Sequence, residues 1–138
     1  DTEMEFIDDL IHEIAHSVEH THKDIVYASG LVEKEFRKKR NELYALLKDK
    51  GYSPPISMSN EINYNKDIDD YFYKEVGYPA LNQLVLFGKL FVGSYSATSI
   101  REYFATGFEH YFMGEKELVR DFCPILYKVL IELENMGG

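Results

Sequence analysis

Two histidines near the start of the chain have the spacing of a metal site on a helix. His12 and His16 lie four residues apart, so on a helix both rings project from the same face. At this spacing two imidazole nitrogens can reach one zinc ion at about 2.0–2.1 Å. Glu13 follows the first histidine and can hydrogen-bond a water molecule at the ion. These residue types therefore predict a zinc centre built for water activation.

The pattern His12-Glu13-Ile14-Ala15-His16 on a helix is the mechanistic signature of zinc peptidases. A chance match is the alternative, because a chain with five histidines can carry this spacing by accident. Helical periodicity around the motif argues against chance. One helix is expected from about residue 5 to residue 20, with a single apolar stripe formed by Phe6, Ile7, Leu10, Ile11, Ile14 and Val18.

A catalytic zinc ion needs a third protein ligand and leaves its fourth position to water. The best candidate is Glu102, near the start of a predicted helix with apolar neighbours. A carboxylate buried in such surroundings needs a partner, because burying a lone charge is costly. The alternative for Glu102 is an exposed glutamate of the first helical turn, where the helix dipole favours negative charge. The residues alone leave both interpretations open.

Several spaced segments resemble one family of zinc metallopeptidases. The segment from His12 to Glu19 and the later run Glu102-Tyr103-Phe104-Ala105-Thr106-Gly107-Phe108 resemble the family of anthrax lethal factor and the Pro-Pro endopeptidases. Tyr95 stands seven residues before Glu102, as a tyrosine does in that family, and Cys123-Pro124-Ile125-Leu126-Tyr127 is similar to a downstream family pattern. The resemblance covers the first 20 residues and about residues 93–133.

The resemblance implies a zinc-dependent endopeptidase that hydrolyses protein or peptide substrates. It implies that His12, His16 and Glu102 bind Zn²⁺, that Glu13 is the general base, and that Tyr95 donates a hydrogen bond to the oxyanion. The alternative is a zincin-fold structural or interaction module without catalytic activity. The intact Glu13 favours the enzyme, since an inactive copy has no chemical need for the base.

The chain departs from the family in three respects. His12 and Glu102 are 90 positions apart, which predicts an insertion over about residues 23–92. Thr106 replaces a glutamate of the family pattern. Eleven residues precede His12, too few for the sheet that pairs with extended substrate in such peptidases. We therefore expect this chain to be the C-terminal part of a larger protein that also has an upstream domain. On its own, the chain should bind zinc but cleave peptides poorly.

Other candidate residues receive plainer interpretations. Glu19 either supports His16 through a hydrogen bond or is a solvated acid, with nothing to separate the two. His20 and His22 follow the motif and could be mistaken for ligands, but His20 lies a further turn away and is expected at the surface. His110 is expected to be a partly buried structural residue. The single cysteine, Cys123, lies in an apolar run and is expected in the core, so it does not indicate the redox compartment.

Composition limits the partners. The 138 residues suggest one domain, and a net charge of −9 argues against binding nucleic acid, because an acidic surface repels phosphate. No apolar run reaches the ~20 residues of a membrane span, and nothing in the sequence indicates a cellular location.

We expect a mainly α-helical fold, the helical C-terminal lobe of a zincin-like domain, with little or no sheet in this chain. Beyond the first helix, helices are predicted at about residues 29–50, 79–91, 100–113, 117–122 and 124–134. Gly51 should end the second helix. Residues 57–78 are expected to be a loop with one helical turn around Ile68, Tyr71 and Phe72, and residues 93–99 a turn. In the helix at 100–113, four aromatic residues should point inward: Phe104, Phe108, Tyr111 and Phe112.

Overall fold

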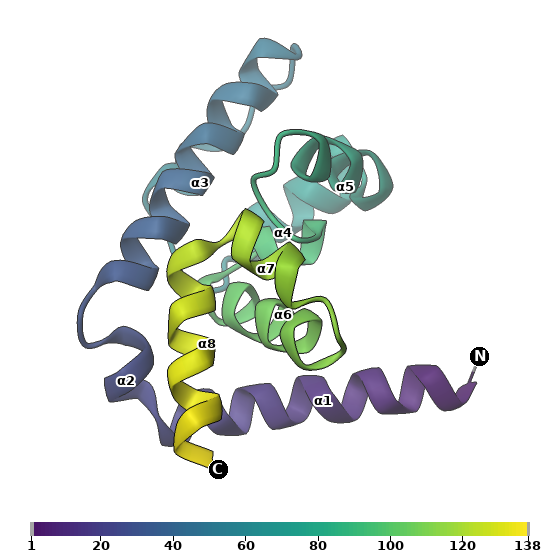
Figure 1. The fold of residues 1–138 in the computed structure, drawn as a ribbon. Helices are drawn as coiled ribbons and strands as arrows, with labels where there is room; N and C mark the ends of the chain where they lie inside the picture. Colours follow the sequence, from purple (N-terminus) through teal and green to yellow (C-terminus); the bar gives the residue numbers. More distant parts are fainter. Residues whose placement is uncertain (1, 138) are drawn as a thin grey trace.

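The computed structural model describes residues 2–137, which form α-helices and short helical turns without any strand (Figure 1). The mainly α-helical fold is therefore confirmed, whereas its identity as the lobe of a zincin-like domain stays a prediction. The helices are α1 (Thr2–Thr21), α2 (Lys23–Tyr27), α3 (Leu31–Asp49), α4 (Lys66–Tyr71), α5 (Tyr78–Phe87), α6 (Ile100–Phe112), α7 (Lys116–Phe122) and α8 (Pro124–Gly137). Two 3₁₀ turns, η1 (Ile56–Ser59) and η3 (Ser94–Ala97), and a π turn, η2 (Phe72–Val76), connect them.

The segment between the two predicted metal-binding regions is more helical than expected. The helix predicted at 29–50 begins at Leu31, because Gly30 has a positive φ of 76° and separates α2 from α3. The predicted loop at 57–78 contains α4, which begins where the Asn65 side chain accepts a hydrogen bond from the Ile68 backbone N–H at 3.1 Å. Gly51 ends α3 as predicted, with φ 93°.

Helix α6 lies at the centre of the molecule, between α1, α7 and α8 (Figure 1). Phe104, Phe108 and Tyr111 are buried as predicted, but Phe112 is substantially exposed, so that part of the prediction is wrong. The predicted insertion contributes to the same core, because Phe36 and Leu43 of α3 are fully buried in it. Residues 23–92 are thus packed into the domain rather than appended to it.

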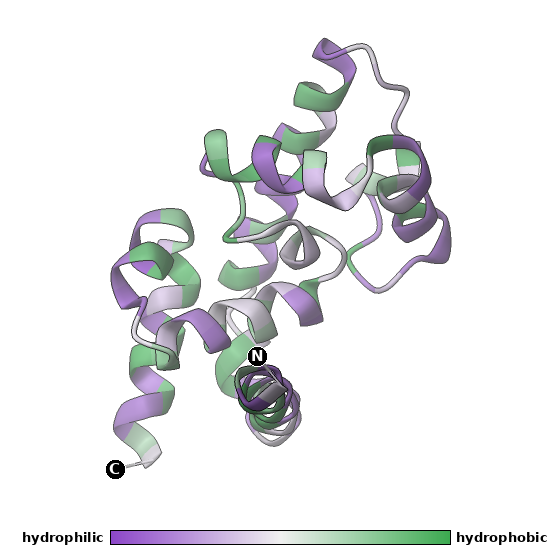
Figure 2. Ribbon diagram, turned by 90° about the vertical axis from the view of Figure 1, so that its right-hand side faces the viewer, coloured by the Kyte–Doolittle hydropathy of each residue, from purple (hydrophilic) through white to green (hydrophobic). Residues whose placement is uncertain are grey.

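Helix α1 contacts the rest of the molecule along only part of its length. Its C-terminal half packs against α6 through Ala15, and its N-terminal half projects beyond the other helices (Figure 1). The view down its axis places the other helices to one side of it (Figure 2). The predicted stripe is therefore divided: Ile11 and Val18 pack on the core, whereas four residues form an exposed apolar face, namely Phe6, Ile7, Leu10 and Ile14.

No helix within residues 2–137 is both long and apolar enough to cross a membrane.

Candidate metal centre

The start of α6 sets the position of Glu102. Ser99 is the N-cap residue, and its Oγ accepts a hydrogen bond from the Glu102 backbone N–H at 3.2 Å. This spacing is that of a capping box, in which the glutamate side chain reaches back to the capping residue. The Glu102 carboxylate instead faces α1, where both its oxygens approach histidine rings. The interpretation of Glu102 as an ordinary exposed helix-start glutamate is therefore wrong.

A buried arginine fixes the segment that leads into α6. Arg40 of α3 is 2% exposed and donates hydrogen bonds to the carbonyls of Ala97 at 2.7 Å and Thr98 at 2.9 Å. It also donates to the carbonyls of Met58 and Glu61 at 2.9 and 3.0 Å. Burial lowers the pKa of Arg40 to about 10, which still leaves the side chain charged at neutral pH. One side chain of the predicted insertion thus joins the η1 region to the residues just before Ser99.

His12, His16 and Glu102 meet between α1 and α6. The Nε2 atoms of His12 and His16 lie 3.2 Å apart. Glu102 Oε2 lies 3.0 Å from His12 Nε2, and Glu102 Oε1 lies 3.3 Å from His16 Nε2. One ligand atom from each residue lies within 4.8 Å of the other two, a separation that one ion can bridge. The structure therefore brings together the three residues that the sequence proposed as metal ligands.

Two of the atoms that face each other in this centre, His12 Nε2 and Glu102 Oε2, are both acceptors. His12 Nδ1 is hydrogen-bonded to Glu109 Oε1, so in the neutral imidazole Nδ1 carries the proton and Nε2 carries a lone pair. Glu102 Oε2 is buried and has no hydrogen-bond partner within the described residues, although His12 Nε2 lies close to it. Two acceptors that face each other in this way are stabilised by a cation between them. Two imidazoles and a carboxylate form a common ligand set of catalytic zinc, so the residues fit that ion.

Glu109 was not predicted from the sequence. It lies seven residues after Glu102, which is two turns along the same face of α6, and this spacing was the available signal. Its bond to His12 Nδ1 matches the carboxylate–histidine pairs that orient zinc ligands in metalloproteins. Glu109 therefore selects the His12 tautomer that faces the centre.

Glu19 is buried rather than solvated. The residue is 3% exposed, and its carboxylate accepts hydrogen bonds from the Tyr27 hydroxyl and from Arg101 Nε, the latter at 3.0 Å. Burial and the bond to Glu19 raise the pKa of Tyr27 far above its ordinary value, so the phenol stays protonated. Glu19 Oε1 lies 3.9 Å from His16 Nδ1, and Arg101 Nη2 lies 3.5 Å from the same nitrogen. Of the two interpretations of Glu19, the solvated acid is thus excluded.

The two predicted catalytic residues both reach solvent. Glu13 is exposed on α1 and follows His12 in the chain. Tyr95, in η3, is 53% exposed, and its ring packs against Tyr78 with centroids 6.3 Å apart. Partial burial and the negative charge of Glu102 raise the pKa of Tyr95. Its phenol therefore keeps its proton at neutral pH and remains a hydrogen-bond donor.

The remaining histidines lie outside the centre. His110 is half-buried and pairs with Glu115 at 2.8 Å, in agreement with the structural role expected for it. His20 is exposed as expected, whereas His22 is half-buried. Within residues 2–137, His12, His16 and Glu102 are the single group with metal-binding geometry.

Comparison of the chain with protein-family models, curated proteins and solved structures gives no match.

Proposed function

We propose that the protein is a zinc-dependent endopeptidase whose metal is held by His12, His16 and Glu102. The observation that supports this most directly is the approach of two Nε2 atoms to the two oxygens of one carboxylate, of which the buried Oε2 lacks a hydrogen-bond donor. Two further features support peptide hydrolysis as the reaction. One is Glu13, the exposed glutamate that follows the first histidine, and the other is the resemblance to the lethal factor and Pro-Pro endopeptidase family.

A zinc ion held by His12, His16 and Glu102 would supply Lewis-acid polarisation of the scissile carbonyl and would lower the pKa of a bound water molecule. Glu13 accepts a proton from the attacking water and passes it to the leaving amine. The protonated phenol of Tyr95 donates a hydrogen bond to the developing oxyanion. Glu109 holds His12 in the tautomer that presents Nε2, and Arg40 holds the segment that carries Tyr95 and begins α6.

The substrate needs an extended binding surface as well as a metal. The resemblance implies a sheet beside the metal helix, and the exposed apolar face of α1 leaves room for such a partner. We infer that an upstream part of the same polypeptide supplies it. Activity is therefore best measured on this chain and on a longer polypeptide that contains it.

Metal content is the first test, because it does not depend on substrate. Protein purified without chelator is expected to contain about one zinc ion per chain, and His12→Ala should remove it. His110→Ala is the matched control, since that histidine lies outside the centre and should leave the zinc in place. Protein that neither contains zinc nor takes it up would refute the proposal.

Separate variants test the chemistry. Glu13→Gln should retain zinc, because Glu13 is not a ligand, but should abolish cleavage of a peptide library. Tyr95→Phe should bind substrate nearly normally and lose about 10²–10³ in turnover, the usual effect of one oxyanion donor. If neither this chain nor the longer polypeptide cleaves any peptide when loaded with zinc, the result would favour the alternative, a zincin-fold interaction module without catalytic activity.

A further inference from the structure

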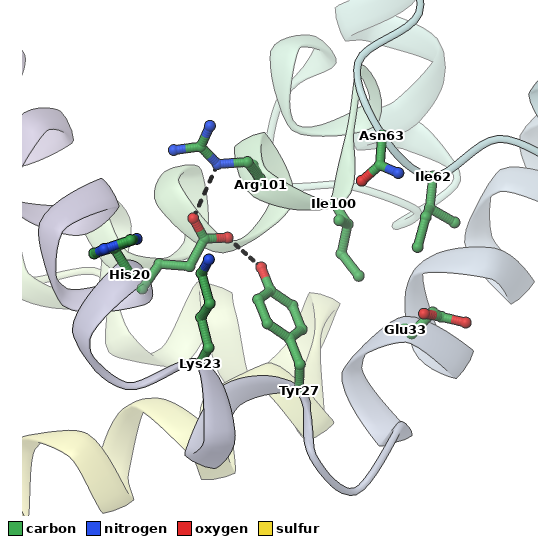
Figure 3. Close-up of a pocket in the computed structure, with 9 residues that line it drawn as sticks. His20, Lys23, Tyr27, Glu33, Ile62, Asn63, Ile100 and Arg101 are labelled. Carbon is green, nitrogen blue, oxygen red and sulfur yellow. Dashed lines mark hydrogen bonds and ion pairs between the residues drawn. The ribbon is translucent and has the colours of Figure 1, made fainter.

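A cavity of about 360 Å³ adjoins the candidate metal centre, between the end of α1, α2 and the start of α6 (Figure 3). Its volume falls in the ~300–1,000 Å³ range of ligand sites in proteins. Arg101 belongs to both regions, because it lines the cavity and places Nη2 3.5 Å from His16 Nδ1. A group held in the cavity would thus lie next to the centre.

Four charged side chains line this cavity, the acids Glu19 and Glu33 and the bases Lys23 and Arg101, and three of the four have a charged partner. One oxygen of the Glu19 carboxylate is paired with Arg101, and the other accepts a hydrogen bond from the Tyr27 hydroxyl (Figure 3). Glu33 pairs with Arg37 at 3.0 Å. Lys23 has no hydrogen bond or ion pair within the described residues. The formal charges of the lining sum to zero, and Lys23 is the one lining charge without a partner among residues 2–137.

The guanidinium of Arg101 still has donors to offer. Its Nε serves Glu19, and the side chain is 62% exposed. An arginine can present its two terminal nitrogens together to a carboxylate, which gives a stronger contact than a neutral hydrogen bond. Ile62 and Ile100 line the same cavity with apolar surface. The lining thus combines an aliphatic wall and two cations with the paired carboxylates of Glu19 and Glu33. The wall and the cations match the methylene stem and charged end of a glutamate side chain.

We propose that this cavity is a specificity pocket that binds an acidic side chain of the substrate peptide next to the scissile bond. The assignment rests on the proposed endopeptidase function, because it places the peptide at the centre formed by His12, His16 and Glu102. Lys23 is the specificity-determining residue, since its charge is otherwise unpaired. Glu19 is the residue that positions Arg101.

Binding of peptide hydroxamates tests the pocket without requiring turnover. Two pairs of short peptide hydroxamates are compared. Within each pair the peptides differ only in having glutamate or glutamine next to the hydroxamate group. In one pair this residue precedes the hydroxamate, and in the other pair it follows it. Calorimetry on the zinc-loaded full chain should show about tenfold tighter binding of glutamate in one pair, the scale of a hydrogen bond to a charged group. The preference should shrink as salt rises from about 0.05 M to about 0.5 M.

Lys23→Gln should remove most of this preference. Lys38→Gln makes the same charge change at an exposed site on α3 and should leave the preference intact. Equal affinity for glutamate and glutamine in both pairs, or a preference that survives Lys23→Gln, would overturn the pocket assignment while the metal centre stands. If none of the hydroxamates binds, the proposed function fails and the assignment fails with it.

Discussion

Arg40 is buried and Glu102 is largely shielded from solvent, and the molecule treats these two charged side chains in opposite ways. Between α3 and the segment before α6, Arg40 donates four hydrogen bonds to backbone carbonyls and is also stacked over Phe36 at 5.0 Å. Between α1 and α6, Glu102 is 17% exposed in its side chain, and one of its oxygens has no donor. Each nitrogen of Arg40 thus has a hydrogen-bond acceptor, whereas one oxygen of Glu102 has no donor.

The difference separates a structural charge from a proposed metal ligand. Buried polar groups in proteins are nearly always hydrogen-bonded, so an unsatisfied one needs a reason. Arg40 needs no further partner, because backbone carbonyls accept hydrogen bonds from each of its nitrogens. For Glu102 the missing partner and the two facing Nε2 atoms are what the proposed zinc ion would explain together. Rules such as the pairing of every buried polar group are expected to be broken at functional sites and kept elsewhere in a protein.

The largest expected effect is on metal binding. Glu102→Gln should abolish stoichiometric zinc binding, since it replaces the anionic ligand with a neutral amide. The free energy of unfolding of the metal-free protein should change by less than about 1 kcal/mol or rise, because a poorly satisfied charge is removed. Zinc titration and urea denaturation of the apo form measure the two quantities. Unaltered zinc affinity would show that the missing hydrogen bond does not mark a ligand.

The opposite region should show the opposite result. Arg40→Met should reduce the free energy of unfolding by about 3–5 kcal/mol, because it leaves buried carbonyls without donors. Arg37→Met is the matched control on the same helix: its exposed pair with Glu33 is expected to contribute about 0.3–0.5 kcal/mol. Denaturant titration compares them. If both substitutions cost the same small amount, the Arg40 network does not hold the segment before α6.

The sequence revealed the ligands of the candidate centre better than it revealed their support. His12 and His16 carry a local signal, because four-residue spacing alone puts them on one helical face. Arg40 carries none: an arginine within a charged helix normally indicates a solvated face, and its four acceptors come from two distant loops. Phe6 and Leu10 have the periodicity of buried residues, yet they are exposed. Periodicity shows that a helix has an apolar side but does not show what covers it.

The smallest effect should come from Glu109, which acts on the centre only through His12. Glu109→Gln retains the size of the side chain but removes the charge that orients the imidazole and raises its basicity. Zinc should still bind, with affinity weakened about 10–100-fold, the usual range for partners of zinc ligands. Glu115→Gln is the control, because it removes the same charge from the partner of His110, outside the centre. Competition with a chromophoric chelator measures both affinities at fixed pH. An unchanged affinity in Glu109→Gln would show that His12 is held by its helix alone, whereas complete loss of zinc would make Glu109 a ligand in its own right.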